Sequence, residues 1–414
     1  MGARASGSPL VAGRSGGAGW AALVPAAELV AAGTVAGVPG MVPSRRQSLA
    51  VVPELILADV ERAGRGVIVL AVDGLPLPTA RDCWGAAVVG CLTSVFPTVS
   101  APAWLTALTG AEPAEHGVPG MVYRLPGRPV RVLAVTGRAL DDPDPARGAG
   151  ADHPEPTTLA SAPPTVFERA RERGARPVAI GRELDGLPGP WTDALLRGAD
   201  QPLARPAAGD RFRAEAADPA AVVRAVVTDV EQVLAGSRTG RKQLLWCYLN
   251  LDDHLHRHGP DGATGEALGW LAGVAAGWAG RGWTVLAHSD HGQRPCARDP
   301  ELARAWAELD TPGLCELPAG GAGRVRWLHP LPGRADELAG RLATALGDAA
   351  LVVRRADLDR LGLIRLTPAL HARLGEVVAI AATDRFPVPD PSLRWEHGST
   401  HPDEMLVPLA AWRP

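Results

Sequence analysis

The chain has 414 residues, of which 46% are hydrophobic and 21% are charged, and its formal net charge is −3. This composition is typical of a soluble globular protein, and the length suits one large α/β domain with insertions or two domains. No run of basic residues is present, so we expect no binding to a nucleic-acid backbone.

Cysteine usage indicates the redox compartment. The five cysteines include no C-x-x-C pair. An odd number without that spacing favours neither a disulfide framework nor a thiolate zinc site. We therefore expect a reducing compartment and a cytoplasmic protein.

Residues 1–60 are predicted to be a disordered N-terminus and a leading helical segment. Residues 1–19 are rich in Gly, Ser, Ala and Arg, which is typical of disorder. Residues 29–42 are apolar but too short to span a bilayer, so we interpret them as a helix and turn packed on the domain. A cleaved export signal is the alternative, and no membrane association is expected.

The first strong strand pattern is RGVIVLAVDGLP at residues 65–76. Residues 67–72 are a continuous apolar run, as expected for a central parallel strand that is covered on both faces. The run ends at Asp73 and Gly74.

Two helices are predicted next, over residues 78–92 and about 101–108. The second follows FPTVS, which carries hydroxyls at Thr98 and Ser100. A hydroxyl at this point has two interpretations. Ser and Thr cap helices, but a helix N-terminus also binds phosphate, which a hydroxyl there can attack.

The rest of the chain alternates helices and strands after a Pro- and Asp-rich stretch at residues 121–163, which we interpret as a long loop or insertion. This alternation indicates an α/β fold with a mostly parallel sheet and helices on both faces. The predicted helices cover 164–174, 219–235, 266–279 and 335–346, and the predicted strands cover 176–181, 244–251, 284–289, 325–328, 351–353 and 377–382.

Three acidic residues, Asp73, Asp252 and Asp290, each follow a predicted buried strand. Sites in open α/β sheets form outside the carboxyl ends of the strands, so these three carboxylates are expected to converge. Uncompensated, they would repel one another, and a cation is therefore their natural partner.

Histidines add nitrogen ligands to this set. His256 lies four residues after Asp252, and on a helical turn the two share a face. His291 directly follows Asp290, and His397 comes from the C-terminal region. Mixed Asp and His ligands suit Zn²⁺, with Mn²⁺ as a harder alternative. Three Asp and three His are too many for one tetrahedral zinc and suit two ions.

These residues belong to an ordered set of short motifs. The set comprises Asp73-Gly74, Pro97-Thr98-Val99-Ser100, Thr109-Gly110, Pro113 to Gly117, Asp252 with His256 and Gly259, Ser289-Asp290-His291-Gly292, and His397-Gly398. In order and spacing the set resembles the type I phosphodiesterase/nucleotide pyrophosphatase family of the alkaline phosphatase superfamily, its bacterial members in particular. The resemblance covers most of residues 65–410.

The resemblance implies a fold and a domain plan. The fold would be an alkaline-phosphatase-like three-layer α/β/α sandwich, with a mostly parallel central sheet and inserted loops or a small subdomain. The catalytic domain would cover residues 61–414, with an insertion around 121–215 that forms the rim of the substrate pocket.

The resemblance also implies a mechanism in which Ser100 is the nucleophile, two metal ions, expected to be zinc, assist it, and a phospho-serine intermediate forms and is hydrolysed. His116 would be structural. One ion would be held by Asp73, Ser100, Asp290 and His291, and the other by Asp252, His256 and His397.

The substrate is less well defined. Many eukaryotic members carry Asn three residues after the nucleophile, where this chain has Ala103. Trp104 or a backbone N–H is predicted to replace that amide, and Thr98 is a second candidate for substrate contact or for the nucleophile. We expect a small phosphorylated substrate, such as a nucleotide, whose phosphodiester or pyrophosphate bond is hydrolysed.

Two other classes remain as alternatives. One is a phosphomonoesterase or a phosphotransferase such as a mutase on the same fold. The other is a non-catalytic zinc-binding domain, which the intact ligand set disfavours. The sequence leaves the oligomeric state open.

Overall fold

The computed structural model describes residues 47–141, 163–182, 184, 187, 189–203, 218–236 and 240–414. The predicted disorder at 1–19 and helix at 29–42 lie outside these residues. Within them, no helix combines the length and apolar character that crossing a membrane requires.

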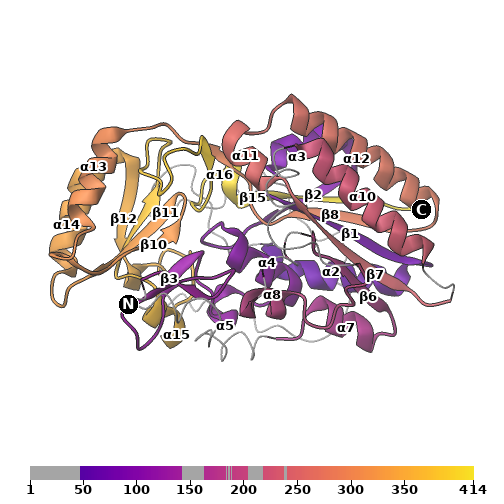
Figure 1. Cartoon of the computed structure of the whole chain (residues 1–414), viewed down its shortest axis with the longest axis horizontal. Coiled ribbons are helices and arrows are strands. Elements are labelled where there is room, and N and C mark those ends of the chain that lie inside the picture. Colours follow the sequence, from indigo (N-terminus) through magenta and orange to yellow (C-terminus); the bar gives the residue numbers. More distant parts are fainter. Residues whose placement is uncertain are drawn as a thin grey trace, which may run out of the picture.

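A six-stranded sheet lies at the centre of the larger part of the molecule, in the order β2-β15-β8-β1-β7-β6 (Figure 1). β1 runs parallel to β7 and β8, and β6 runs parallel to β7, whereas β15 is antiparallel to both of its neighbours. The predicted mostly parallel sheet is thus confirmed. Its strands are β1 (Gly66–Asp73), β2 (Val88–Thr93), β6 (Arg176–Ile180), β7 (Gln243–Asn250), β8 (Thr284–Ser289) and β15 (Leu406–Trp412).

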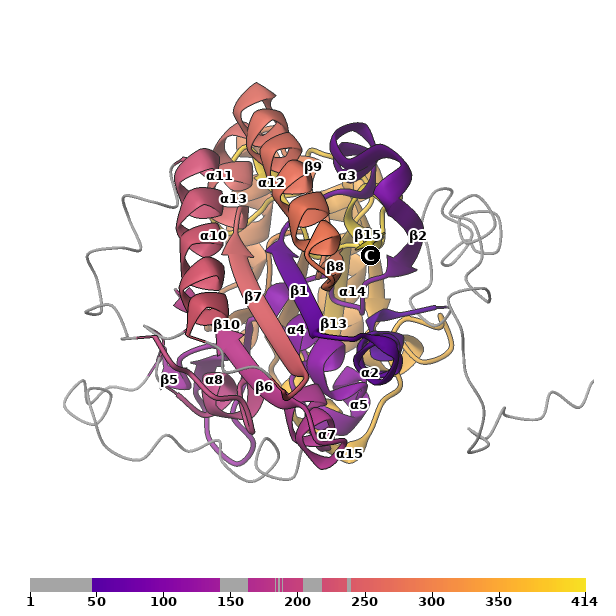
Figure 2. The same cartoon turned by 90° about the vertical axis from the view of Figure 1, so that its right-hand side faces the viewer.

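Helices cover both faces of this sheet and make the three layers (Figure 2). Side chains alternate along a strand, so Val69 and Ala71 of β1 pack on one face while Leu70 and Val72 pack on the other. The first face carries α2 (Val52–Arg62), α4 (Ser100–Thr109), α7 (Val166–Glu172) and α8 (Pro190–Leu195), and the second carries α3 (Leu77–Trp84), α10 (Pro219–Ala235) and α12 (Gly262–Gly280).

A second sheet, with the order β12-β13-β11-β10-β3-β4-β5 and antiparallel pairing throughout, forms the smaller part of the molecule. On β11, Leu328 packs against the helices α13 and α14, whereas the neighbouring Trp327 joins the core shared with the central sheet. This part consists of β3 (Val122–Arg124), β4 (Arg131–Leu133), β5 (Arg138–Ala139), β10 (Cys315–Ala322), β11 (Val325–Pro330), β12 (Ala350–Arg354), β13 (Val377–Ala381), α13 (Pro300–Leu309) and α14 (Ala335–Leu346).

Short elements complete the described chain, and several of them carry site residues. β9 and β14 pair as a two-stranded ribbon. The short elements are η2 (Leu49–Val51), η3 (Gly85–Ala87), α5 (Pro113–His116), α11 (Asp252–His258), β9 (Arg294–Pro295), η5 (Gly347–Ala349), η6 (Arg355–Asp357), α15 (Pro368–Arg373), β14 (Trp395–Glu396) and α16 (Pro402–Met405).

Two local predictions are wrong. The helix predicted over 78–92 ends at Trp84, because Gly85 takes a positive φ of 51° as its C-cap. The β-branched Val88 and Val89 then begin β2, an edge strand. In the predicted loop at 121–163, the described residues form β3, β4 and β5 of the second sheet. The domain boundary at residue 60 stays a prediction, although α2 packs into the central core.

Candidate active site at the carboxyl edge of the central sheet

The three acids predicted to converge lie at one edge of the central sheet. Asp73 is the last residue of β1, whose neighbours β7 and β8 lead into Asp252 and Asp290. Gly74 lets these segments approach closely. Its φ is 75°, and a Cβ there would lie 2.6 Å from Asp252 Oδ1. The Asp-Gly pair is therefore required by a close approach as well as by a turn.

A first group surrounds the hydroxyl of Ser100, the first residue of α4. Ser100 Oγ lies 3.1 Å from His291 Nε2 and 3.4 Å from Asp73 Oδ1. His291 Nε2 lies 3.1 Å from Asp290 Oδ2. Asp290 and His291 are fully buried, whereas Ser100 is partly exposed. The hydroxyl is thus the member of this group that a substrate can reach.

A second group lies beside the first. His256 Nε2 is 3.1 Å from Asp252 Oδ2, as expected for positions one turn apart on α11. His397 Nε2 is 3.9 Å from the same oxygen, and the rings of His397 and His291 stack with centroids 3.6 Å apart. The ligand-type atoms of Asp252, His256 and His397 all lie within 4.8 Å of one another, as do those of Asp73, Asp252 and His291.

Each of the three histidines is oriented through its Nδ1 atom. His256 Nδ1 lies 2.8 Å from the carbonyl oxygen of Trp395, His291 Nδ1 lies 3.1 Å from that of Gly292, and His397 Nδ1 lies 2.6 Å from that of Thr98. A carbonyl only accepts hydrogen bonds, so each Nδ1 carries the proton. The lone pairs of the Nε2 atoms are then left for a metal, the usual arrangement of histidine ligands.

The carboxylates sit where ionisation is costly without a cation. Burial, together with the charges of Asp290 and Asp252, raises the pKa of Asp73 well above its usual value. Burial and the charge of Asp252 raise the pKa of Asp290 to about 8. Burial also disfavours the charged form of Asp252, but the imidazoles of His256 and His397 outweigh it and hold the pKa of Asp252 below its usual value.

These observations fit one or more divalent cations. Asp290 Oδ2 is buried without a hydrogen-bond partner among the described residues, although a carboxylate oxygen in that position needs one. A cation between Asp73, Asp290 and His291 would satisfy it and would return the pKa values of both acids toward normal. The mixed oxygen and nitrogen donors suit Zn²⁺ or Mn²⁺.

Two other predicted residues have partners inside the protein. Thr98 is fully buried, and its hydroxyl donates to the carbonyl of Ser399 at 2.8 Å and accepts from the N–H of Gly398 at 2.9 Å. Trp104 is also fully buried, and its indole N–H donates to Asp73 Oδ2 at 3.2 Å. Their predicted contacts with substrate stay untested, and the described contacts instead connect each of them to a predicted metal ligand or its loop.

His116 also lies inside the protein, as its structural interpretation predicts. Its side chain is fully buried, with Nε2 3.3 Å from the hydroxyl of Thr106 and Nδ1 accepting from the N–H of Val118 at 3.2 Å. These contacts fix the segment that follows α4.

Sequence reasoning missed two polar side chains in contact with the acids. The hydroxyl of Tyr248 donates to Asp73 Oδ2, and the amide of Gln293 donates to Asp252 Oδ1. Signals for both were present. A tyrosine within a buried strand needs an acceptor for its hydroxyl, and Gln293 directly follows the Ser-Asp-His-Gly motif.

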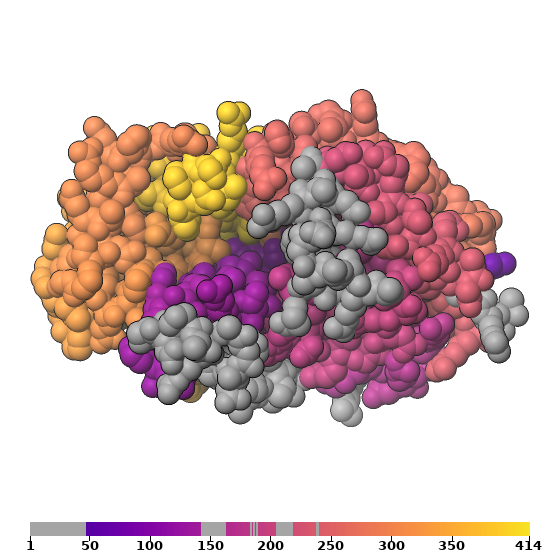
Figure 3. Space-filling view, in the orientation of Figure 1, coloured from indigo at the N-terminus to yellow at the C-terminus, as the bar shows by residue number. Residues whose placement is uncertain are grey.

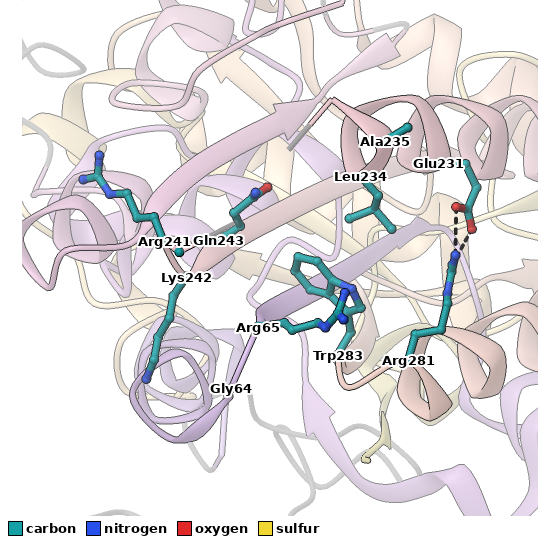
Figure 4. A pocket seen from close by; sticks show the side chains of 11 residues that line it. Gly64, Arg65, Glu231, Leu234, Ala235, Arg241, Lys242, Gln243, Arg281 and Trp283 are labelled. Carbon is teal, nitrogen blue, oxygen red and sulfur yellow. Dashed lines mark hydrogen bonds and ion pairs between the residues drawn. The ribbon is translucent and has the colours of Figure 1, made fainter. Parts of the chain in front are cut away.

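A large hollow of about 680 Å³ lies elsewhere, at the opposite edge of the central sheet (Figure 4). It is lined by residues at the starts of β1 and β7, among them Arg65 and Gln243, together with Trp283. None of the predicted metal ligands lines it, and its Arg281 is paired with Glu231 at 2.5 Å. This hollow is therefore separate from the predicted site at the carboxyl edge. In the space-filling view, a recess lies between the yellow C-terminal segments and the purple residues that follow β2 (Figure 3).

A mostly parallel sheet between two helical layers, with a hydroxyl at a helix N-terminus and Asp and His at the strand ends, is the arrangement that the family resemblance implies for an enzyme of the alkaline phosphatase superfamily. The model of the type I phosphodiesterase/nucleotide pyrophosphatase family matches residues 77–401, and the chain belongs to this family. It is therefore a phosphoric ester hydrolase by family. No protein among those with curated functions matches the sequence.

Solved structures confirm the fold. Murine ectonucleotide pyrophosphatase/phosphodiesterase 5 is 17% identical, with a TM-score of 0.54 over 84% of this chain and 88% of that chain. An inactive variant of the murine enzyme in complex with AMP is 16% identical, with a TM-score of 0.53 over 84% of this chain and 88% of that one. Phosphonoacetate hydrolase from Sinorhizobium meliloti 1021, in complex with phosphonoacetate, is 17% identical, with a TM-score of 0.56 over 85% and 90% of the two chains.

Proposed function

We propose that the chain is a two-metal phosphodiesterase or nucleotide pyrophosphatase with Ser100 as its nucleophile. One observation carries the proposal. The partly exposed Ser100 Oγ lies 3.1 Å from His291 Nε2 and 3.4 Å from Asp73 Oδ1, at the start of α4. A serine that merely caps a helix has no need of two ligand-type side chains around its oxygen.

The two ions would be held by the two groups described above. When bound, they lower the pKa of the Ser100 hydroxyl and neutralise charge on the phosphoryl oxygens. Ligand-type atoms of Asp252 lie within 4.8 Å of those of Asp73 and His291 as well as those of His256 and His397, which supports placing the two ions close to each other. The ligands proposed for one ion are Asp73, Ser100, Asp290 and His291, and those for the other are Asp252, His256 and His397.

Hydrolysis then takes two displacements at phosphorus, the first by Ser100 and the second by water. Ser100 Oγ attacks in line, the bond from phosphorus to the leaving oxygen breaks, and the phosphoryl group rests on Ser100. Water attacks the same phosphorus from the side that the leaving group vacated, and the bond to Ser100 Oγ breaks. The N-terminus of α4, where the Ser100 and Ala101 N–H groups begin the helix, favours the negative charge of the phosphoryl oxygens.

We infer a small phosphorylated substrate, and the bound AMP of the murine structure supports a nucleotide. A phosphomonoester substrate is the second candidate, because Ala103 stands where many eukaryotic family members have the Asn whose amide contacts a phosphoryl oxygen. The test is to compare kcat/KM on a chromogenic phosphodiester and a phosphomonoester with metal-loaded protein. A preference of at least about tenfold for the diester is expected, and the opposite preference would identify a monoesterase.

The first prediction concerns metal content. Protein purified without chelator is expected to hold about two zinc equivalents per chain, because six Asp and His side chains form the site together with Ser100. Elemental analysis measures this directly. Chelator treatment should abolish hydrolysis, and zinc should restore it. A metal content near zero after zinc soaking would contradict the two-metal proposal.

The second prediction distinguishes His397 from the nearby His401. His401 lies outside the site, because it accepts from the N–H of Asp403 at 3.2 Å as the N-cap of α16 and contacts Arg294. His397→Ala is expected to lose one of the two ions and most of the activity, and His401→Ala is expected to keep both ions. Metal analysis of the two variants checks this, and the reverse pattern would assign the ligand to His401.

A further inference from the structure

The second oxygen of Asp73 is held by two aromatic donors. The indole N–H of Trp104 donates to Asp73 Oδ2 at 3.2 Å, and the hydroxyl of Tyr248 donates to the same oxygen. The other oxygen, Oδ1, faces Ser100 Oγ at 3.4 Å and His291 Nε2 at 3.6 Å. The two oxygens of this buried carboxylate therefore have separate surroundings, one aromatic and one catalytic.

The fold places both donors in this position. β7 pairs with β1 in parallel, and Tyr248 lies opposite Ala71, two residues before Asp73. Because residues two apart on a strand share a face, Tyr248 projects from the same face of the sheet as Asp73. Trp104 lies four residues after Ser100, which puts the two side chains on the same side of α4. The helix that presents the proposed nucleophile thus also carries a donor to the carboxylate beside it.

Packing limits the freedom of these donors. The ring of Trp104 meets that of Tyr248 edge to face, with centroids 5.8 Å apart, and Trp246 stacks on Tyr248 at 6.1 Å. Trp104 and Trp246 are fully buried and Tyr248 nearly so. A buried indole N–H and a buried phenol each need an acceptor, and here both use the same oxygen.

We propose that Trp104 and Tyr248 are positioning residues that fix the rotation of the Asp73 carboxylate, so that only Oδ1 is offered to the first metal ion and to Ser100. The inference rests on the proposed function, because it assigns a ligand role to Asp73. Without the donors, the carboxylate rotates and its oxygens exchange places. Outer hydrogen bonds of this kind tune metal affinity as well as geometry.

The experiment measures zinc affinity without any substrate. Metal-free wild type and Tyr248→Phe are titrated with Zn²⁺ in competition with a chromophoric chelator. Tyr248→Phe is expected to bind one ion as the wild type does and the other about 10- to 100-fold more weakly. In zinc-limited assays kcat is expected to fall by a similar factor while KM changes by less than about twofold, because the Tyr248 side chain is nearly buried and its hydroxyl is directed to Asp73.

Trp246→Phe is the matched control. Trp246 belongs to the same aromatic cluster and the same strand, but its indole N–H has no hydrogen-bond partner among the described residues. It is expected to bind both ions with wild-type affinity. Trp104→Phe provides the second donor deletion, and thermal unfolding of the metal-free proteins shows that each variant folds before it is titrated.

Two results would overturn the inference. Either Tyr248→Phe binds both ions with wild-type affinity, or Trp246→Phe weakens binding as much as Tyr248→Phe, which would make the effect one of packing. A wild type that binds no zinc under these conditions is a different result, since it removes the two-metal proposal itself and the inference with it.

Discussion

Replacing Ser100 with alanine is expected to lower kcat by about four to six orders of magnitude. If Ser100 is the nucleophile, the phosphoryl group must pass through its oxygen, which is the hydroxyl oxygen that lies 3.1 Å from His291 Nε2. Metal content should stay near that of the wild type, because Asp73, Asp290 and His291 still surround the first ion. The measurement is steady-state hydrolysis of a chromogenic diester together with metal analysis of the same sample.

The matched control restores the hydroxyl at the same position. Ser100→Thr should keep a substantial part of the activity, because threonine presents the same oxygen with one added methyl group. Thr98→Ser should remain active too, since it keeps the hydroxyl that bonds the backbone of Gly398 and Ser399. Loss of activity in Thr98→Ala with an active Ser100→Ala would move the nucleophile to residue 98.

Acid quench of a labelled reaction supplies the second readout. The label is expected on the peptide that contains Ser100, as a phospho-serine. An active Ser100→Ala enzyme with no labelled peptide would mean that water attacks phosphorus directly, and Ser100 would then be only the first residue of a helix.

The position of the acids could be predicted from the sequence because a simple rule places them. Parallel strands end at one edge of a sheet, and Asp73, Asp252 and Asp290 each follow a buried apolar run. The i, i+4 spacing of Asp252 and His256 needed only a helical turn. His397 had no such local rule. It entered the candidate set only as an imidazole of the C-terminal region, and the family resemblance assigned it to the second ion.

The partners that orient these ligands could not be predicted in the same way. The carbonyls of Thr98 and Trp395 accept from His397 and His256 across about 300 and 140 residues of chain, and such contacts are set by tertiary packing. Tyr248 is similar, since its target is known only when the register of β7 on β1 is known. The strand β2, which was predicted as helix, could have been found from the sequence, because Gly85 already indicates the end of the preceding helix.

The two parts of the molecule are joined by an ion pair between Arg324 and Glu404, both fully buried. Arg324 directly precedes β11, and its backbone N–H donates to the carbonyl of His397 at 2.7 Å. Glu404 lies on α16, and its carbonyl accepts from the N–H of Gly292 at 2.8 Å. The pair therefore holds together the two loops that carry His397 and His291.

Removing one member of this pair should destabilise the whole protein. Glu404→Ala is expected to lower the free energy of unfolding by about 3–5 kcal/mol, because the guanidinium of Arg324 is left buried without its counter-charge. Urea denaturation of the metal-free protein measures the change. The matched control is Asp357→Ala, which breaks an exposed pair with Arg360 at 3.0 Å and is expected to change stability by less than about 1 kcal/mol.

A double substitution can show whether Glu404→Ala destabilises the protein through the unpaired charge of Arg324 or through loss of packing. Arg324→Met combined with Glu404→Leu removes both charges and keeps much of the buried volume, so it is expected to recover most of the stability that Glu404→Ala loses. The zinc affinity of the double variant should still fall, since the pair no longer fixes the loops of His397 and His291. A Glu404→Ala protein as stable as Asp357→Ala would show that the buried charge of Arg324 is satisfied without Glu404, by contacts such as the one at 3.1 Å to the carbonyl of Thr383.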